Sequence, residues 1–160
     1  MVDLHVLTGG DWLLWHEARI AALTDAPDAF KSALADWDKG GREQWGARLH
    51  IPGAHNVVAL RDSHPVGVVR GVPADADTSE LRSLWVSPQV RGEGVGERLV
   101  ETVASWALRS GFTRLKLAVI PGNQPAIALY RRCGFVTTEE RGDLLLDGET
   151  RERVMVRRLR

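Results

Sequence analysis

Residues 80–96 read ELRSLWVSPQVRGEGVG, an apolar run that ends near a proline and leads into three glycines at alternate positions. The run over 80–86 is typical of a β-strand, and Pro88 ends it because proline has no N–H to donate to a neighbouring strand. Apolar side chains then recur at helical spacing over 94–109, at Val95, Leu99, Val103 and Trp106. The sequence therefore predicts a strand, a glycine-rich turn and an amphipathic helix in direct succession.

The glycine-rich turn predicts a site for a phosphate-bearing ligand. Gly92, Gly94 and Gly96 allow the backbone to come close to a ligand and to adopt conformations that other residues avoid. The first N–H groups of the following helix have no helical acceptor and lie at the positive end of the helix dipole, which favours an anion. Arg91 adds a mobile cation at the rim. A glycine-rich turn without any ligand is the alternative.

Two common phosphate-binding motifs do not fit this turn. A P-loop requires lysine and then serine or threonine after its last glycine, whereas Gly96 is followed by Glu97 and Arg98. A dinucleotide-binding turn requires the spacing G-x-G-x-x-G, whereas this chain has G-x-G-x-G. Neither a P-loop nor a dinucleotide-binding turn is therefore predicted, and a turn without any ligand stays open beside another class of phosphate ligand.

The elements on either side of this unit predict a mixed α/β fold. A strand at 115–120 should follow the 94–109 helix as a right-handed parallel crossover from 80–86. The remaining strands are expected at 2–8, 57–61, 66–72, 135–138 and 154–159, with a further short one at 144–146. The remaining helices are expected at 12–24, 42–50 and 124–133, with an irregular segment at 27–41.

The composition indicates an ordinary globular chain. The 160 residues suit a single domain over 1–160, and 21 basic residues balance 21 acidic ones, which argues against nucleic acid as a partner. The single cysteine, Cys133, excludes an internal disulfide and favours a reducing compartment. Neither a signal peptide nor a membrane-spanning run is visible, so we expect a cytoplasmic protein with no membrane partner.

Two motifs at the expected separation resemble those of the GNAT superfamily of acetyl-CoA-dependent N-acetyltransferases. Residues 89–94, QVRGEG, match its Q/R-x-x-G-x-G/A signature, and residues 80–86 are similar to the strand that precedes it. Residues 123–135, NQPAIALYRRCGF, are similar to its second motif, in which an asparagine leads into a helix with a tyrosine. The strong match covers about a third of the chain, and the order of the expected elements agrees over all of it.

The resemblance implies a fold and a cofactor. The fold would be a central mixed sheet, mostly antiparallel, with about four flanking helices. The parallel strands 80–86 and 114–120 would splay apart to hold coenzyme A. The pantetheine arm would pair with the open edge of residues 84–86, the pyrophosphate would bind backbone N–H groups from Arg91 to Gly96, and Asn123 would help to hold the cofactor. The implied cofactor-binding residues are Leu84, Trp85, Val86, Gln89, Arg91, Gly92, Glu93, Gly94, Val95, Gly96, Asn123, Ala126 and Tyr130.

The resemblance also implies direct attack of a primary amine on the thioester of acetyl-CoA in a ternary complex. Such an amine is protonated at neutral pH and needs a base, for which Glu80 is the candidate. Tyr130 is the candidate proton donor to the departing sulfur, although it could only position the sulfur or pack in the core. Glu80 could equally be an exposed carboxylate at a strand end. Alternation places Glu80 on the side of Leu84 and Val86 unless a bulge intervenes.

Other reactive residues have simpler roles. Backbone N–H groups near Trp85 and Val86 are the expected oxyanion donors. Cys133, one residue before a glycine that ends a helix, is expected to pack rather than to react. The five histidines are scattered without metal-ligand spacing, so no metal is expected.

The sequence leaves the acceptor open among a small-molecule amine, a peptide N-terminus and a lysine. In the resembling family, segments equivalent to 24–46 and 139–152 form the acceptor pocket, and a homodimer is an expectation of the family. Acidic and aromatic residues in the first segment suit a cationic amine, although a solvated acidic loop is the simpler reading. A non-catalytic acyl-CoA-binding module and a nucleotide-phosphate-binding protein of another class are the alternative functions.

Overall fold

A single sheet of seven strands forms the centre of the computed structural model, which describes residues 1–25, 51–145 and 147–159. The order across the sheet is β1-β2-β3-β4-β5-β7-β6, and every neighbouring pair is antiparallel except β4 and β5. The strands are β1 (Asp3–Val6), β2 (His55–Arg61), β3 (His64–Pro73), β4 (Thr78–Val86), β5 (Arg114–Val119), β6 (Val136–Leu144) and β7 (Arg151–Arg158).

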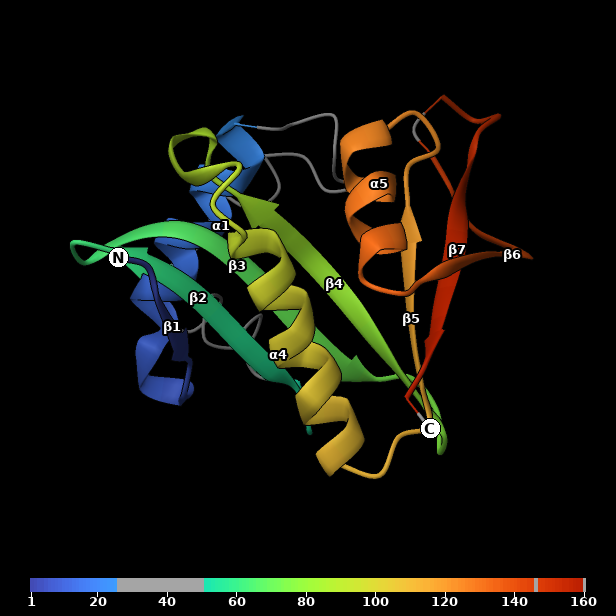
Figure 1. Ribbon diagram of the computed structural model, residues 1–160, viewed down its shortest axis with the longest axis horizontal. Helices are drawn as coiled ribbons and strands as arrows, with labels where there is room; N and C mark the ends of the chain where they lie inside the picture. Colours follow the sequence, from blue (N-terminus) through green and yellow to red (C-terminus); the bar gives the residue numbers. More distant parts are fainter. Residues whose placement is uncertain (26–50, 146, 160) are drawn as a thin grey trace.

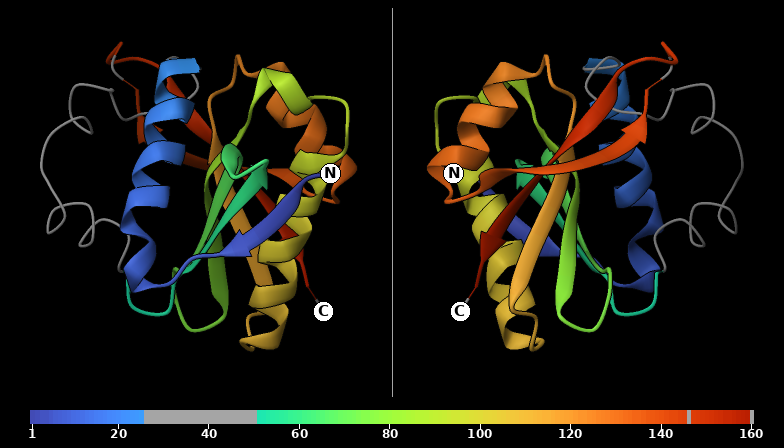
Figure 2. Two further views of the ribbon diagram at one scale, coloured as in Figure 1. Left: turned by 90° about the vertical axis from the view of Figure 1, so that its left-hand side faces the viewer. Right: turned by 90° about the vertical axis from the view of Figure 1, so that its right-hand side faces the viewer.

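Helices cover both faces of the sheet (Figure 1). Helix α1 (Trp12–Asp25) lies on one face, and α4 (Val95–Arg109) and α5 (Gln124–Arg132) lie on the other, as the turned views in Figure 2 show. Two short 3-10 helices, η1 (Gly9–Asp11) and η3 (Pro88–Val90), precede α1 and α4. No helix in the described ranges is long and apolar enough to cross a lipid bilayer.

The two faces of the sheet have separate apolar cores. On the α4 and α5 face, Leu99, Val103 and Tyr130 pack with strand residues such as Val69 and Leu117. On the other face, the core consists of Leu7, Trp15, Ala18, Ala22, Val58, Val68 and Trp85. The helical spacing of the apolar residues in α4 thus matches a buried face, as the sequence predicts.

The parallel crossover β4-α4-β5 is confirmed, and its two strands separate midway along their length. Cα partners run from Thr78 with Arg114 to Leu81 with Leu117, and the pairing ends there. Beyond this point β4 and β5 diverge toward the end of the sheet near α5 (Figure 1). The expected splay between the two central strands is therefore present.

A β-bulge in β4 changes which face its side chains occupy. Arg82 pairs with Arg70 and Trp85 pairs with Val68, so that two residues of β4 oppose one residue of β3. Within the bulge, Ser83 has a φ of 61°, which a residue other than glycine rarely adopts.

Simple alternation therefore fails across the bulge. Leu81 and Leu84 both pack on the α4 side, although they are three residues apart, and Trp85 packs on the α1 side. Glu80, which neighbours Leu81, thus faces α1 and not the side of Leu84 and Val86. The prediction that alternation places Glu80 with those residues is wrong, because a β-bulge intervenes.

Some boundaries differ from the sequence expectations. Strand β6 runs from Val136 to Leu144, much further than 135–138, and it takes in the first residue of the short strand expected at 144–146. Its side chains are mostly exposed because β6 lies at the edge of the sheet, so no apolar alternation marks it. Three α-helices are described. The helix expected at 42–50 and the irregular segment at 27–41 lie outside the described residues.

Candidate active site

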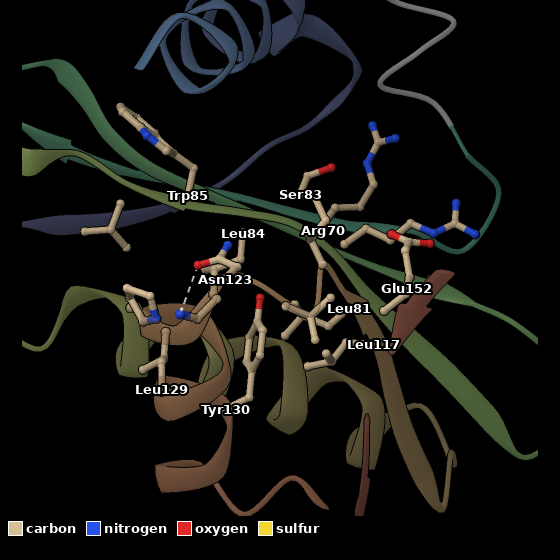
Figure 3. Close-up of a pocket in the computed structure, with 18 of the residues that line it drawn as sticks. Arg70, Leu81, Ser83, Leu84, Trp85, Leu117, Asn123, Leu129, Tyr130 and Glu152 are labelled. Atoms are coloured by element: carbon tan, nitrogen blue, oxygen red, sulfur yellow. Dashed lines mark hydrogen bonds between the residues drawn. The ribbon is translucent and has the colours of Figure 1, made fainter. Parts of the chain in front are cut away.

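A cleft of about 1370 Å³ opens where β4 and β5 separate. Its walls come from β4, β5, β7, the turn before α4, the inner side of α5, and the α1 face of the sheet (Figure 3). Ligand pockets commonly measure about 300–1,000 Å³. The cleft therefore has room for a cofactor arm and a second substrate together.

The glycine turn presents free N–H groups to this cleft. Gly92 and Gly94 have φ values of 82° and 80°, the left-handed conformation that glycine tolerates best. The first helical hydrogen bond of α4 runs from the Arg98 N–H to the Gly94 carbonyl at 3.1 Å. The N–H groups of residues 95–97 consequently have no helical acceptor, and these residues line the cleft, as the anion-site prediction requires.

Two residues that the resemblance assigns to the cofactor lie outside the cleft lining. Gln89 is exposed in η3, and the Glu93 side chain forms an ion pair with Arg61 at 2.5 Å. The Glu93 N–H also donates to the Val90 carbonyl at 3.3 Å, within the turn itself. The other implied cofactor residues all line the cleft, namely Leu84, Trp85, Val86, Arg91, Gly92, Gly94, Val95, Gly96, Asn123, Ala126 and Tyr130.

Arg91 is not the freely mobile cation that the sequence suggests. Its guanidinium donates to the Asp25 carboxylate at 2.9 Å and to the Val86 carbonyl at 3.2 Å. The same Asp25 oxygen accepts a hydrogen bond from the Trp85 ring N–H at 2.9 Å. The last residue of α1 thus connects the glycine turn to the far end of β4.

The edge of β4 that faces β5 offers backbone groups beyond Leu81. The Ser87 N–H donates to the Val66 carbonyl on β3 at 2.8 Å. Because successive N–H groups of an extended strand point to opposite edges, the Val86 N–H faces the cleft, whereas the Trp85 N–H faces β3. Of the two expected oxyanion donors, Val86 is thus the one directed toward the cleft.

Asn123 begins α5 as its N-cap. Its side-chain oxygen accepts a hydrogen bond from the Ala126 N–H at 3.3 Å, and Pro125 lies in the first turn (Figure 3). Ala126 and Leu129 lie on the cleft side of the helix. The cap therefore fixes the direction in which α5 presents Tyr130.

Tyr130 projects from α5 into the gap between the strands. Its hydroxyl is directed toward the cleft beneath Leu84 and Asn123, while its ring packs edge-on to Phe135 with centroids 5.9 Å apart (Figure 3). Burial raises the pKa of the Tyr130 phenol above its ordinary value of 10.0. No residue that the structure describes hydrogen-bonds to this hydroxyl, which leaves its proton available to a ligand.

Glu80 lines the cleft on the α1 side of the sheet. It forms ion pairs with Arg82, two residues along β4, and with Lys116 on β5 at 4.0 Å. It is therefore not a solitary carboxylate at a strand end. Both partners contact its carboxylate oxygens.

Several cleft residues were not anticipated from the sequence. Arg19 on α1 and Arg70 on β3 are 4% and 6% exposed, and Glu152 on β7 is 9% exposed. Arg70 is a single charge within an apolar stretch, and this interruption is the one signal that could have identified it, whereas Arg19 lies two residues after Glu17 and has no such signal. From the expected acceptor segment 139–152, the lining residues are Glu140, Arg141, Gly142, Asp143, Arg151 and Glu152. Residues 26–46 of the other expected segment lie outside the described residues.

Cys133 packs at the end of α5. It is 8% exposed, and burial raises the pKa of its thiol, so the reactive thiolate is disfavoured. This agrees with a packing role. Among the described residues, no three histidine, cysteine or acidic side chains gather in a way that could hold a metal ion.

The family model of the acetyltransferase (GNAT) family matches residues 15–135, so the chain belongs to this family. Thialysine N-epsilon-acetyltransferase from Mus musculus is 39% identical over 54 residues, which are 34% of this chain and 32% of that protein. The matched region thus spans about a third of that relative's length.

Solved structures show the same fold at low sequence identity. A GNAT-family acetyltransferase from Streptococcus pneumoniae has a TM-score of 0.77 at 19% identity, covering 99% of both chains. The yncA protein of Salmonella typhimurium, solved with its cofactor acetyl-CoA, has a TM-score of 0.77 at 18% identity, covering 100% of this chain and 95% of that one.

Proposed function

We propose that this protein transfers an acetyl group from acetyl-CoA to a primary amine by direct attack within a ternary complex. One observation carries the proposal: the free N–H groups of residues 95–97 and the Tyr130 hydroxyl line the same cleft between β4 and β5. Membership of the GNAT family supports the reaction class.

The cleft suits coenzyme A at two points. The amides at the start of α4 would bind its diphosphate, aided by Arg91 when this side chain leaves Asp25. The open edge of β4 beyond Leu81 would pair with the amide groups of the pantetheine arm, as a further strand would. Bound acetyl-CoA supplies a thioester whose carbonyl carbon accepts the amine.

The residues of the cleft would then support the transfer. Glu80, directly or through water, would take a proton from the ammonium group of the acceptor, and the neutral amine would then attack. The Val86 N–H would stabilise the negative charge that develops on the carbonyl oxygen. Tyr130 would donate a hydrogen bond to the sulfur as it leaves.

The raised pKa of Tyr130 defines its role more closely. A coenzyme thiol resembles a free thiol, with a pKa of about 8.5, and is a stronger acid than this buried phenol. Complete proton transfer from Tyr130 to the thiolate is therefore uphill. A hydrogen bond that stabilises the departing sulfur is the better fit, with the final proton coming from the amine or from water.

The experiment is an amine panel followed by release of free thiol from acetyl-CoA, alongside thermal-shift measurements with acetyl-CoA. Stabilisation by the cofactor together with turnover on at least one amine supports the enzyme. Stabilisation without turnover on any amine favours the second candidate, a non-catalytic acyl-CoA-binding module. Absence of stabilisation contradicts both.

A cytoplasmic location and a homodimer are further proposals. The buried Cys133 thiol agrees with a reducing compartment. Size-exclusion chromatography with light scattering tests the dimer, since a monomer at every concentration would rule it out.

A further inference from the structure

Lys116 places an amine inside the cleft that the proposed chemistry does not use. It lies on β5, its side chain is 28% exposed, and it lines the cleft together with Glu80 and Tyr130. The chain has three lysines, and Lys116 is the only one among the residues that the structure describes. The cleft in which we place acetyl transfer to a primary amine thus contains a primary amine of its own.

Lys116 shares a face of the sheet with Glu80. The two residues are Cα partners in the parallel pairing of β4 with β5, so their side chains leave the sheet on the same side. The flanking Leu115 and Leu117 pack in the core under α4 and α5, which directs Lys116 to the opposite, α1 face. Its Nζ lies 4.0 Å from a carboxylate oxygen of Glu80. The amine is therefore next to the residue that we propose as the base.

An ion pair, and not a hydrogen bond, holds this amine. Among the described residues, the Lys116 Nζ pairs with Glu80 and has no hydrogen-bond partner. A partly exposed ion pair contributes little to stability, and the four-carbon stem of lysine is flexible. The nitrogen can therefore move from Glu80 toward a ligand in the cleft at little cost.

The gap between β4 and β5 connects this amine with the expected position of the thioester. The pairing of the two strands ends at Leu81 and Leu117, one residue beyond Lys116, and one residue is about 3.3 Å along a strand. Tyr130 enters the gap from α5 (Figure 3), whereas Glu80 and Lys116 line it from the α1 face. A thioester with its sulfur at Tyr130 would therefore present its carbonyl to the opening in which the amine lies.

We propose that Lys116 is a self-acetylation site: when no acceptor occupies the cleft, bound acetyl-CoA transfers its acetyl group to the Lys116 Nζ of the same chain. The inference rests on the proposed acetyl transfer and adds a covalent modification of the protein to it. Nearness favours the reaction, because an amine held beside a bound thioester reacts at a high effective concentration.

The step uses groups that the proposed function already contains. The ammonium group of Lys116 first gives a proton to Glu80 and then attacks the carbonyl carbon as a neutral amine. A C–N bond forms, the C–S bond breaks, and the sulfur leaves with the electron pair of that bond. The nitrogen then loses its second proton, which the thiolate accepts, and Glu80 passes the first proton to water. The products are a neutral amide on Lys116, coenzyme A with a free thiol, and one proton.

The test incubates the protein with acetyl-CoA that carries a deuterated acetyl group, without an added amine. Deuterium distinguishes acetyl groups gained in the assay from any acquired during expression. Peptide mass spectrometry then follows Lys31, Lys39 and Lys116. We expect Lys116 to be labelled at least about tenfold faster than the other two, at a rate per chain that is independent of protein concentration. A rate that rises with protein concentration would show transfer between chains and overturn the inference.

Y130F distinguishes catalysed labelling from spontaneous acetylation. Loss of the hydroxyl should slow the labelling of Lys116 by about 10²- to 10³-fold, as it should slow transfer to an added amine. Spontaneous acetylation of an accessible lysine does not depend on Tyr130. Equal labelling of Lys116 in Y130F and wild type overturns the proposal, and so does faster, Tyr130-dependent labelling of Lys31 or Lys39.

Two further variants locate the site. K116R keeps a positive charge beside Glu80 but lacks the amine, so the intact mass should no longer show the fast label. R114K is the matched control, because it introduces an amine on the same strand and face, two residues away and outside the cleft lining. The amine of R114K should be labelled only at the slow rate of Lys31 and Lys39, and labelling as fast as that of Lys116 overturns the proposal. Thermal-shift stabilisation by acetyl-CoA shows that each variant is folded.

The outcomes separate this inference from the proposed function. Turnover of an added amine without labelling of Lys116 overturns self-acetylation and leaves the acetyltransferase intact. Absence of cofactor stabilisation, of turnover and of labelling contradicts both together. An added amine that is turned over should slow the labelling, because both amines need the same thioester and Glu80. Unchanged labelling at a saturating concentration of that amine overturns the shared site.

Discussion

Arg91 and Asp25 form an ion pair of 2.9 Å that joins the glycine turn to the last residue of α1. If the diphosphate of coenzyme A binds at this turn, it competes with Asp25 for the same guanidinium. An exposed ion pair contributes up to about 1 kcal/mol, or about fivefold in affinity. D25N keeps an oxygen that can accept from Trp85, so we expect two- to fivefold tighter acetyl-CoA binding by calorimetry, by order of magnitude.

The matched variant is R91Q, which should weaken acetyl-CoA binding and reduce its dependence on salt. In the double variant, D25N should no longer have an effect, because its partner is absent. Weaker binding by D25N alone would show instead that Asp25 holds Arg91 in the position that the cofactor requires.

Y130F should separate chemistry from binding. The hydroxyl has no hydrogen-bond partner among the described residues, and the ring contact with Phe135 is kept, so folding should be unaffected. We expect kcat to fall by about 10²- to 10³-fold, the usual loss when one hydrogen-bond donor to a developing negative charge is removed. The dissociation constant of acetyl-CoA should stay within about threefold. Unchanged kcat in a folded variant would remove Tyr130 from the mechanism.

The pH profile follows from the raised pKa of Tyr130. Its phenol stays protonated beyond pH 10, so kcat/KM should rise with pH as the amine loses its proton and should show no descending limb below about pH 10. A descending limb near pH 9 that Y130F abolishes would contradict this.

The same shift affects stability in a defined direction. In the unfolded chain the phenol ionises above about pH 10, whereas the folded protein keeps it neutral. The contribution of the neutral phenol to the free energy of unfolding is therefore complete below pH 10 and is lost as the pH rises above 10. Wild type should lose more stability than Y130F between about pH 10 and 11 in chemical denaturation.

Gly94 and Gly111 offer a matched pair for testing the anion site. Both have positive φ, 80° and 91°, and a Cβ at either position would meet nothing within 4 Å. Alanine at either site should cost about 1 kcal/mol of stability through backbone strain. Only G94A should also weaken acetyl-CoA binding, because it alone shifts the amides at the start of α4. Equal affinities for the two variants would argue against the diphosphate site.

Gly71 allows the packing of α4 on β3 to be tested. A Cβ there would lie 2.6 Å from the Trp106 ring and 3.0 Å from Val103. G71A should destabilise the protein by about 1–3 kcal/mol, as overpacking does. Gly122, where a Cβ would meet nothing within 4 Å, is the control, and G122A should unfold at the wild-type denaturant midpoint. A stable G71A would show that Trp106 moves aside easily.

Local patterns were sufficient to predict the centre of this fold. The glycines at 92–96, the apolar face of 94–109 and the N-terminal signals of 123–125 each produce the expected element, since every one is a short-range effect. The splay of β4 from β5 was expected from the resemblance to a family and not from the residues themselves.

Other features depend on packing that no local pattern encodes. Serine does not favour positive φ, so nothing in the sequence indicates the bulge at Ser83. The bulge places Glu80 and Leu84 on opposite faces of the sheet, where simple alternation would place them on the same face. Arg70 is buried against the Trp15 ring, and Arg19 on α1 is also buried, whereas arginine is normally exposed. Strand β6 is recognisable only through its partner β7.

The early end of β4–β5 pairing at Leu81 and Leu117 has a consequence for amide hydrogen exchange. Most sheets are best protected at their central strands, but here the Val86 amide belongs to a central strand and faces a cleft. This amide should exchange quickly in the protein alone and slowly with acetyl-CoA, while those facing β3 stay slow throughout. In this sheet, the ligand should therefore slow amide exchange at a central strand and not at the edge strands.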